Sequence, residues 1–240
     1  MSDDTPKLGA IDRRGLLARI SIFASLSDAD LDRLVEITTV KPLRAKQTLF
    51  HKGETAVALY GVMNGRLKAS AAGADGKEVV FALMDPGEVV GEIALLDSEP
   101  RSATVVAMEK SELLCLDRRD FLPFVEKHPA VAIELASLLA SRLRKLSEVM
   151  EDTLFLTLPS RLAKKILMLA QSYGKPTDDG VMIELKLPQQ ELGELVGTSR
   201  ESINKQLRAW VEEGLVRVDR GYITVLNRDG LEHLARFLML

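Results

Sequence analysis

The chain is poor in cysteine and histidine, and both scarcities exclude classes of site. Cys115 is the one cysteine among 240 residues, so a single chain can form neither an internal disulfide nor an all-cysteine metal cluster. The three histidines, His51, His128 and His233, are too scattered in the sequence to indicate the metal site of a catalytic barrel. His51 has no obvious second ligand, which favours a loop or core residue over a haem ligand. We therefore expect neither an enzyme nor a bound metal or haem.

Long apolar runs and an excess of basic residues are also missing. No apolar stretch is long enough to span a bilayer, and Met1–Ala10 is polar and acidic, unlike a secretory signal. Together with the single cysteine, these features predict a cytoplasmic protein that has no membrane partner. The net charge of −3 argues against a uniformly basic surface for nucleic acid but allows a local basic patch.

The stretch from His128 to Leu154 predicts one long helix, because no proline or glycine interrupts it after Pro129. Its large apolar residues recur every three or four positions and form one stripe on a helix about 37 Å long. The stripe comprises Leu135, Leu139, Leu143, Leu146, Met150 and Leu154. Such a helix either packs on its own domain or forms a two-stranded coiled coil. The sequence segments before and after this helix differ in pattern, and its position between them favours a homodimer through residues 130–154.

Between Thr38 and about Leu116 the chain consists of short segments that alternate apolar and polar residues. Turn signals such as Asn64-Gly65 and Asp75-Gly76 separate them, which is typical of antiparallel hairpins. Strands at this spacing predict a small barrel or jelly-roll sandwich. The predicted strands are Leu59–Met63, Leu67–Ala71, Glu78–Leu83, Thr104–Ala107 and Glu112–Leu116, and short helices are predicted at Arg13–Ala24, Asp28–Ile37 and Asp120–Glu126.

The sequence pattern of the C-terminal part predicts a helical domain with a hairpin. Two predicted helices are separated by Val196-Gly197-Thr198-Ser199, where glycine can take a positive φ in a sharp turn. The predicted elements are the helices Ser160–Tyr173, Pro188–Leu195, Arg200–Glu213 and Asp229–Leu240, the strand Met182–Leu185, and a hairpin of Leu215–Val218 with Tyr222–Val225.

The second helix of this pair presents side chains that suit the edges of DNA bases. With Ile203, Leu207 and Trp210 facing inward, its outer face carries Arg200, Glu201, Asn204, Lys205 and Arg208. Ser199 and Gln190 could hold phosphates. The alternatives are a solvated helix face and, for Glu201, a capping box with Thr198. From Leu156 onward 12 Lys and Arg stand against 11 Asp and Glu, so tight binding would need a concentrated patch and two copies.

A second candidate site lies between residues 91 and 104. Gly91 opens a helical turn whose backbone N–H groups can bind one phosphate. Glu92 could accept from a ribose hydroxyl, and Arg101 with Ser102 could hold the phosphate in a charge-assisted pair. The alternative is an ordinary loop with surface charges.

Over residues 20–228 the chain resembles the bacterial cyclic-AMP receptor and fumarate–nitrate regulator (CRP/FNR) family. Gly91-Glu92-Ile93 with Arg101-Ser102-Ala103 is similar to the family's phosphate-binding cassette. Gln190-Glu191-Leu192-Gly193, Val196-Gly197 and Ser199-Arg200-Glu201 are similar to its DNA-binding motif. The resemblance implies that Arg200, Glu201 and Lys205 read a TGTGA-like half-site, although the family often has arginine where Lys205 stands.

The resemblance also assigns roles on the long helix. It implies that Arg142 pairs with Glu92 and that Ser147 reaches the nucleobase from the partner subunit. Leu146 stands where the cyclic-AMP receptor has threonine, which removes one hydrogen bond to the base and leaves cGMP possible beside cAMP. The oxygen-sensing branch has an N-terminal cysteine cluster that this chain lacks, so we expect no iron–sulfur cluster.

The resemblance therefore implies an α+β protein in four parts. These are an N-terminal extension (1–20), a cyclic-nucleotide-binding jelly-roll or barrel (21–127), a dimerisation helix (128–155) and a winged helix-turn-helix (156–240). It implies a homodimeric transcription regulator whose affinity for double-stranded DNA depends on a cyclic nucleotide, with RNA polymerase as a further partner. A regulator of the same fold that needs no ligand, or responds to another effector, stays open.

Overall fold

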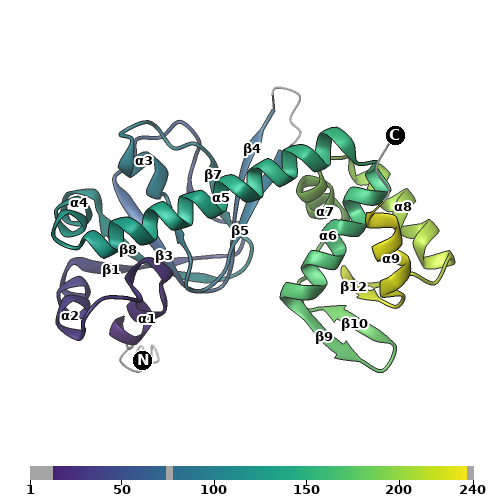
Figure 1. Cartoon of the computed structure of the whole chain (residues 1–240), viewed down its shortest axis with the longest axis horizontal. Helices are drawn as coiled ribbons and strands as arrows, with labels where there is room; N and C mark the ends of the chain where they lie inside the picture. Colours follow the sequence, from purple (N-terminus) through teal and green to yellow (C-terminus); the bar gives the residue numbers. More distant parts are fainter. Residues whose placement is uncertain (1–12, 74–77, 237–240) are drawn as a thin grey trace, which may run out of the picture. The chain divides into compact units, whose positions relative to one another are not determined.

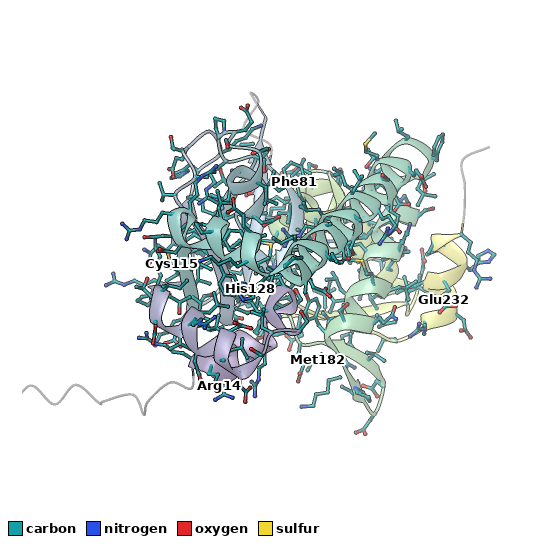
Figure 2. All side chains as sticks on the ribbon, turned by 60° about the vertical axis from the view of Figure 1, so that its left-hand side comes forward. Arg14, Phe81, Cys115, His128, Met182 and Glu232 are labelled. Carbon is teal, nitrogen blue, oxygen red and sulfur yellow. The ribbon has the colours of Figure 1, made fainter. Side chains whose placement is uncertain are left out.

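The computed structural model describes residues 13–73 and 78–236, which divide into two compact units. The first comprises the described residues up to Ser70 together with Ala82–Arg142. The second comprises the described residues of Ala71–Phe81 and those from Leu143 onward. In Figure 2, the labelled Cys115 and His128 belong to the first unit, and Met182 and Glu232 belong to the second.

Within the described residues, the N-terminal strands form two four-stranded antiparallel sheets (Figure 1). One sheet has the order β1-β8-β3-β6, with β1 at Thr38–Leu43, β3 at Ala58–Asn64, β6 at Val89–Val90 and β8 at Ser111–Asp117. The other has the order β2-β7-β4-β5, with β2 at Thr48–Phe50, β4 at Leu67–Ala72, β5 at Glu78–Met84 and β7 at Thr104–Ala107. This architecture confirms the predicted jelly-roll sandwich, and each of the five predicted strands is present.

The strand β3 is buried on both faces because it lies between two cores. Ala58, Tyr60 and Val62 point into the core between the two sheets, whereas Leu59 and Met63 point into a second core on the outer face. This alternation follows from the period of two in a strand. The stretch from Ala58 to Met63, which is apolar throughout, is therefore a central strand with no solvent-facing side.

Helices from both ends of this unit cover the outer face of the β3 sheet. They bury Leu17, Phe23, Leu34, Phe121 and Val131 together against β3 and β8. The elements are α1 (Arg13–Arg19), a 3₁₀ turn (Ser21–Phe23), α2 (Asp28–Ile37), α3 (Glu92–Leu96) and α4 (Arg118–Lys127).

The prediction of one helix over Arg13–Ala24 is wrong. The chain becomes extended at Ile20, with φ −74° and ψ 122°, and resumes as a 3₁₀ turn. The break lets Ile20, Ile22 and Phe23 all reach the core, which a continuous helix could not do. Ser27 caps α2, because its hydroxyl accepts from the Asp30 N–H. Of the predicted extension, residues 1–12 lie outside the described residues.

The long helix α5 spans Pro129–Phe155 and changes character along its length. Val131 and Leu135 are buried against the outer core of the first unit. Farther along, the apolar stripe faces solvent, and Leu143 and Leu154 are 65% and 68% exposed. An apolar stripe left bare on a single chain is typical of a helix that pairs with another.

The second unit packs four helices on a small sheet (Figure 1). The buried side of α8 (Arg200–Glu212) carries Ile203, Leu207 and Trp210, as the sequence predicts. Beyond the described residues lie the predicted end of the terminal helix at 237–240 and the predicted Asp75-Gly76 turn. The elements are α6 (Leu158–Tyr173), β9 (Gly174–Thr177), β10 (Gly180–Ile183), α7 (Gln189–Val196), α8 (Arg200–Glu212), β11 (Val216–Asp219), β12 (Tyr222–Val225) and α9 (Arg228–Ala235).

The strands that the sequence pattern does not predict are β1, β2, β6 and β9. All four lie at the edges of their sheets. Edge strands can be short and can contain proline, because one side of the backbone needs no partner. Pro42 in β1 and Pro176 in β9 fit this explanation, and β6 has only two residues.

Two further features concern membranes and metals. Among the described helices, none combines the length and the apolar character that crossing a membrane requires. In the same part of the chain, no cluster of three or more His, Cys, Asp or Glu side chains is arranged to hold a metal ion.

The packing of the outer core can be tested at Phe121, which is fully buried. We expect Phe121→Ala to lower the free energy of unfolding by about 3–5 kcal/mol, because the substitution leaves a cavity. Urea unfolding at one protein concentration measures this loss. Val57→Ala, at a largely exposed position, is the control and should change stability by less than about 0.5 kcal/mol. A loss below about 1 kcal/mol for Phe121→Ala would contradict the packing described.

Candidate functional site

The first candidate site is the loop where β6 leads into α3. Gly91 has a φ of 89°, a left-handed conformation that favours glycine, and it precedes the first helical residue, Glu92. A Cβ on Gly91 would lie only 2.5 Å from a terminal nitrogen of Arg101. Glycine is therefore needed here both for the turn and for the close approach of the arginine.

Arg101 is buried, with 3% of its surface exposed, and its guanidinium group is held by backbone carbonyls. Its two terminal nitrogens donate to the carbonyl oxygens of Gly91 and Ala58, at 2.8 and 2.7 Å. The group also lies 4.1 Å from the centre of the Phe50 ring, a cation–π contact. Burial lowers the pKa of Arg101, since the charged form has lost water. Its Nε has no partner among the described residues.

Glu92 is the other buried charge of this loop, with 1% of its surface exposed. Its Oε1 accepts from Arg142 of α5, and the same guanidinium donates to the carbonyl oxygen of Val89 at 2.6 Å. The structure thus brings together Glu92 and Arg142, which are 50 residues apart in the sequence. The second carboxylate oxygen, Oε2, has no partner in the described part of the chain.

The loop therefore holds one buried donor and one buried acceptor that lack partners. Leaving such groups unpaired costs about 1–3 kcal/mol each. A ligand that carries an anionic oxygen and a hydroxyl group could satisfy both, with the anion at Arg101 and the hydroxyl at Glu92. The residue types present fit a phosphorylated sugar.

The remaining residues of the predicted cassette are more exposed. Ile93 and Ser102 face solvent, and Ala103 is half-buried. On α5, Leu146 and Ser147 are exposed and belong to the second unit, where the Ser147 hydroxyl donates to the Leu143 carbonyl at 3.0 Å.

The second candidate site is the helix pair α7 and α8. Gly197 ends α7 with a φ of 74°, as the sequence predicts for this turn. Ser199 is the N-cap of α8, because its hydroxyl accepts from the Ser202 N–H at 3.2 Å. The alternative capping box of Thr198 with Glu201 is wrong, since the helix begins one residue later than that motif requires.

The exposed face of α8 carries the side chains expected to reach DNA. Arg200, Glu201, Lys205 and Arg208 are all exposed. Hydrogen bonds from its own backbone N–H and from the Ser199 side chain lower the pKa of Glu201, so it stays an acceptor.

Two amides that are predicted to contact DNA, those of Asn204 and Gln190, already have hydrogen-bond partners within the domain. Asn204 is half-buried, and its Oδ1 accepts from the Gln189 side chain at 3.3 Å. The Gln190 amide donates to Glu194 Oε1 at 3.0 Å. Each of these side chains must give up a contact before it binds DNA.

A cavity of about 430 Å³ separates the start of α7 and α8 from the β11–β12 turn. Lys186, Arg200 and Arg220 contribute cations to its lining, and no acidic residue lines it. Several other cations of this unit are paired, for example Arg217 with Asp179 at 2.6 Å and Arg228 with Glu232 at 2.8 Å. The cavity therefore brings together three cations of a near-neutral domain without an acidic residue in its lining.

Lys186 and Arg220 are absent from the residues predicted for this site. Arg220 lies in the predicted turn of the hairpin, and its positive φ of 49° makes it conspicuous only in the structure. Lys186 joins it because the Leu187 N–H donates to the Gly221 carbonyl at 2.8 Å, which fastens the two loops together.

Two segments of the chain, one around each candidate site, match known domain families. Residues 40–128 match the cyclic nucleotide-binding domain, and residues 160–234 match the Crp-like helix-turn-helix domain. The cyclic AMP receptor protein of Thermus thermophilus is 34% identical over 214 residues, which are 89% of this chain and 96% of that protein. This chain belongs to the CRP/FNR family.

Two further comparisons cover most of the chain. A CRP-like cAMP-activated global transcriptional regulator of Mycobacterium tuberculosis is 28% identical over 221 residues, 92% of this chain and 99% of that protein. The solved structure of the c-di-GMP responsive global regulator CLP of Xanthomonas campestris covers 84% of this chain and all of its own, with a TM-score of 0.77. At 21% identity, that likeness concerns the fold alone. The chain is a CRP-like transcription regulator with a cyclic nucleotide-binding domain and a helix-turn-helix domain.

The Glu92–Arg142 contact of this CRP/FNR regulator gives a stability prediction. We expect Arg142→Met to lower the free energy of unfolding by about 3 kcal/mol, because the buried Glu92 side chain loses its hydrogen-bonded ion-pair partner. The double variant Glu92→Leu/Arg142→Met removes both charges and should recover most of the loss. Urea unfolding of the three proteins measures this. A double variant no more stable than Arg142→Met would contradict the pairing.

Proposed function

We propose that this CRP/FNR regulator binds cAMP or cGMP in its N-terminal domain and thereby controls its affinity for palindromic TGTGA-like DNA. The observation that carries the proposal is the pair of buried atoms without partners, Arg101 Nε and Glu92 Oε2. A cyclic phosphate would accept from the first, and a ribose hydroxyl would donate to the second. The names of the relatives from Thermus thermophilus and Mycobacterium tuberculosis, which refer to cAMP, support the choice of ligand.

Binding must compete with contacts that the chain makes to itself. The two terminal nitrogens of Arg101 donate to Gly91 and Ala58, so a phosphate can accept from them, as distinct from Nε, only when these contacts are exchanged. The backbone N–H groups around Ile93, Ser102 and Ala103 would complete the phosphate site. The ligand can therefore shift the protein only by the difference between its affinities for the two arrangements.

A second candidate is a regulator of the same fold that responds to another effector or to none. The carbonyl contacts of Arg101 favour it, because the guanidinium already has strong partners without a ligand. Leu146 stands where the cyclic-AMP receptor has a threonine that hydrogen-bonds the base. The loss of that hydrogen bond weakens the case for a ligand that contains adenine. The regulator CLP, whose fold is similar, is named for its response to c-di-GMP.

The proposed active form is a homodimer through residues 130–154. The exposed stripe of Leu143, Leu146, Met150 and Leu154 would pair with the same stripe of a second copy. Ser147 of each copy would then approach the nucleobase bound by the partner subunit. Nucleotide binding would act on the hinge near Phe155–Leu156 and set the two recognition helices about 34 Å apart, one turn of DNA.

On DNA, we propose base contacts for Arg200, Glu201, Asn204 and Lys205. Phosphate contacts would come from Ser199 and Gln190, with Lys186 and Arg220 added by the basic cavity. The parts of the chain would be the extension 1–20, the sensor 21–127, the dimerisation helix 128–155 and the winged domain 156–240. RNA polymerase is the further partner, and the cytoplasm is the proposed location. The relatives are regulators, so we propose no enzymatic activity.

The nucleotide proposal predicts the behaviour of Arg101→Leu. Calorimetric titration of the wild type should show binding of cAMP, cGMP or both, and Arg101→Leu should lose it while the protein stays folded. Arg119→Leu, at an exposed arginine in the same unit, should bind as the wild type does. Nucleotide affinity of Arg101→Leu equal to that of the wild type would contradict the cassette assignment. Absence of binding by the wild type would favour the second candidate.

The DNA proposal predicts the behaviour of Arg200→Ala. We expect a loss of about 1–3 kcal/mol on a TGTGA palindrome and a relaxed base preference, because a contact to a base edge disappears. Mobility shifts on the palindrome and on single-base variants measure both effects. Arg228→Ala, whose arginine is paired with Glu232, is the control and should bind all sites as the wild type does. An equal loss on every sequence would mean that Arg200 contacts only phosphate.

A further inference from the structure

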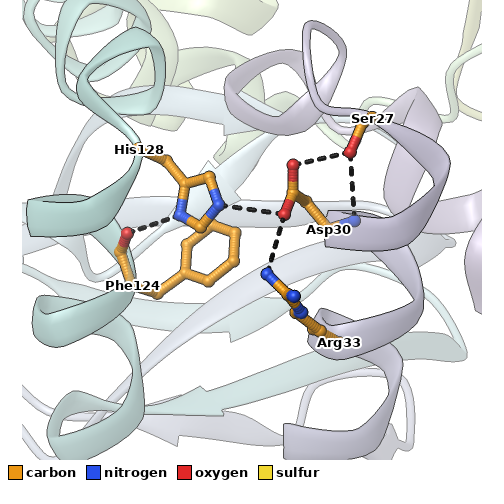
Figure 3. A network of polar contacts seen from close by, with 5 residues as sticks. All are labelled: Ser27, Asp30, Arg33, Phe124 and His128. Carbon is orange, nitrogen blue, oxygen red and sulfur yellow. Dashed lines mark hydrogen bonds and ion pairs between the residues drawn. The ribbon is translucent and has the colours of Figure 1, made fainter.

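His128 lies at the corner where α2, the end of α4 and the start of α5 meet (Figure 3). It is the C-cap of α4, and its carbonyl accepts from the Val131 N–H in the first turn of α5. Its ring stacks on Phe124, with 4.0 Å between ring centres, and Phe124 packs edge-on against Phe23. The side chain is mostly buried, so the partners of its two ring nitrogens are set by the fold.

Both ring nitrogens face groups that accept hydrogen bonds. Nδ1 lies 2.8 Å from the carbonyl oxygen of Phe124, which cannot donate. Nε2 lies 3.1 Å from Oδ1 of Asp30 on α2 (Figure 3). Each neutral tautomer would set one nitrogen lone pair against an acceptor oxygen. The doubly protonated ring satisfies both contacts.

The Asp30 carboxylate is itself held in its ionised form. The Ser27 hydroxyl donates to Oδ2 at 2.6 Å, and Arg33 lies 3.4 Å from Oδ1. The hydrogen bonds from Ser27 and His128 lower the pKa of Asp30. Arg33 on α2, which contacts Asp30, is exposed and therefore screened by water. The charged residues near His128 in the sequence are exposed as well; they are Glu126 and Lys127 on α4 and Glu134 on α5.

The position of His128 also favours a positive charge. The carbonyl groups at the end of α4 point toward it, and a cation near a helix C-terminus is stabilising. The face of the Phe124 ring favours a cation as well.

We propose that His128 is a proton-operated clip, which in its charged form ties α2 to the junction of α4 and α5. The clip has a defined pH window. A histidine whose charged form gains partners on folding adds stability at low pH, and this is lost as the ring gives up its proton on rising pH. Asp30, with its lowered pKa, limits the window on the acid side, because the contact is lost once that carboxylate takes up a proton in the folded state. The clip therefore requires a protonated His128 ring and an ionised Asp30 carboxylate at the same time.

The clip acts at the root of α5, the helix that carries Arg142 to Glu92. A change of pH would thus alter how firmly the N-terminal helices hold the start of α5. This device does not depend on which ligand the cassette binds, and it remains if the protein binds none.

A double-mutant cycle over His128→Gln and Asp30→Asn, in the full-length protein, tests the clip. Urea unfolding constants are measured for the four proteins at about pH 6 and about pH 8.5, at one protein concentration. We expect the coupling between the two residues to be about fivefold to tenfold in the unfolding constant at the lower pH and close to one at the higher. His51→Gln, at an exposed histidine, should show no difference from the wild type at either pH. Equal coupling at both pH values would overturn the proposal.

Nuclear magnetic resonance of the wild-type ring nitrogens gives an answer even where a variant fails to fold. The His128 signals are assigned by comparison with His51→Gln and His233→Gln. At about pH 6 both nitrogens of His128 should carry protons and have similar shifts, as in an imidazolium ion. Widely separated shifts, as in a single neutral tautomer, would overturn the proposal.

Discussion

The burial of the Glu92 carboxylate is the constraint on which the sensor half of this protein depends. Burying a carboxylate that is 1% exposed is costly unless the group is paired, and Arg142 of α5 supplies the partner. The guanidinium group of Arg142 also donates a hydrogen bond to the carbonyl oxygen of Val89. The ligand loop is therefore fastened to the long helix by one guanidinium group, and any molecule that engages Glu92 acts directly on that fastening.

Arg101 has the complementary position on the other side of the loop. Its charge is satisfied by two backbone carbonyls and by the Phe50 ring, so the loop is self-contained in this arrangement. Within residues 13–73 and 78–236, one side-chain atom of Glu92 and one of Arg101 have no hydrogen-bond partner. The loop thus combines a stable arrangement without ligand and a reason to rearrange when an anion with a neighbouring hydroxyl arrives. This is the pattern expected of a switch whose two states differ by a few kcal/mol.

Much of the fold could be predicted from the sequence because local rules determine it. Asn64-Gly65 marks a hairpin, and Gly197 marks the turn between α7 and α8, since both positions need a positive φ. The edge strands β1, β2, β6 and β9 could not be predicted, because pairing with their neighbours, and not their own sequence pattern, makes them strands. The break at Ile20 was equally hidden, because burial in the outer core overrides local helix propensity.

The candidate sites divide in the same way. The exposed face of α8 can be predicted from the helical spacing of its apolar residues, whereas contacts between distant segments cannot be predicted in this way. The pairing of Arg142 with Glu92 could be expected only from the family resemblance, because nothing local joins residues 50 positions apart. Lys186 and Arg220 line the same cavity because the Leu187 N–H donates to the Gly221 carbonyl and joins their two loops. The His128 contacts depend on the packing of α2 against α4, which no sequence pattern indicated.

The central claim is that one molecule in the Glu92–Arg101 loop changes how tightly the helix-turn-helix holds DNA. Thermodynamic linkage tests it most directly, because two coupled sites must affect each other equally. The affinity for cAMP or cGMP is measured with and without saturating operator DNA, and the affinity for the operator is measured with and without saturating nucleotide. The account predicts that both affinities rise by the same factor, about fivefold or more. Nucleotide affinity that is unchanged by operator DNA would contradict it.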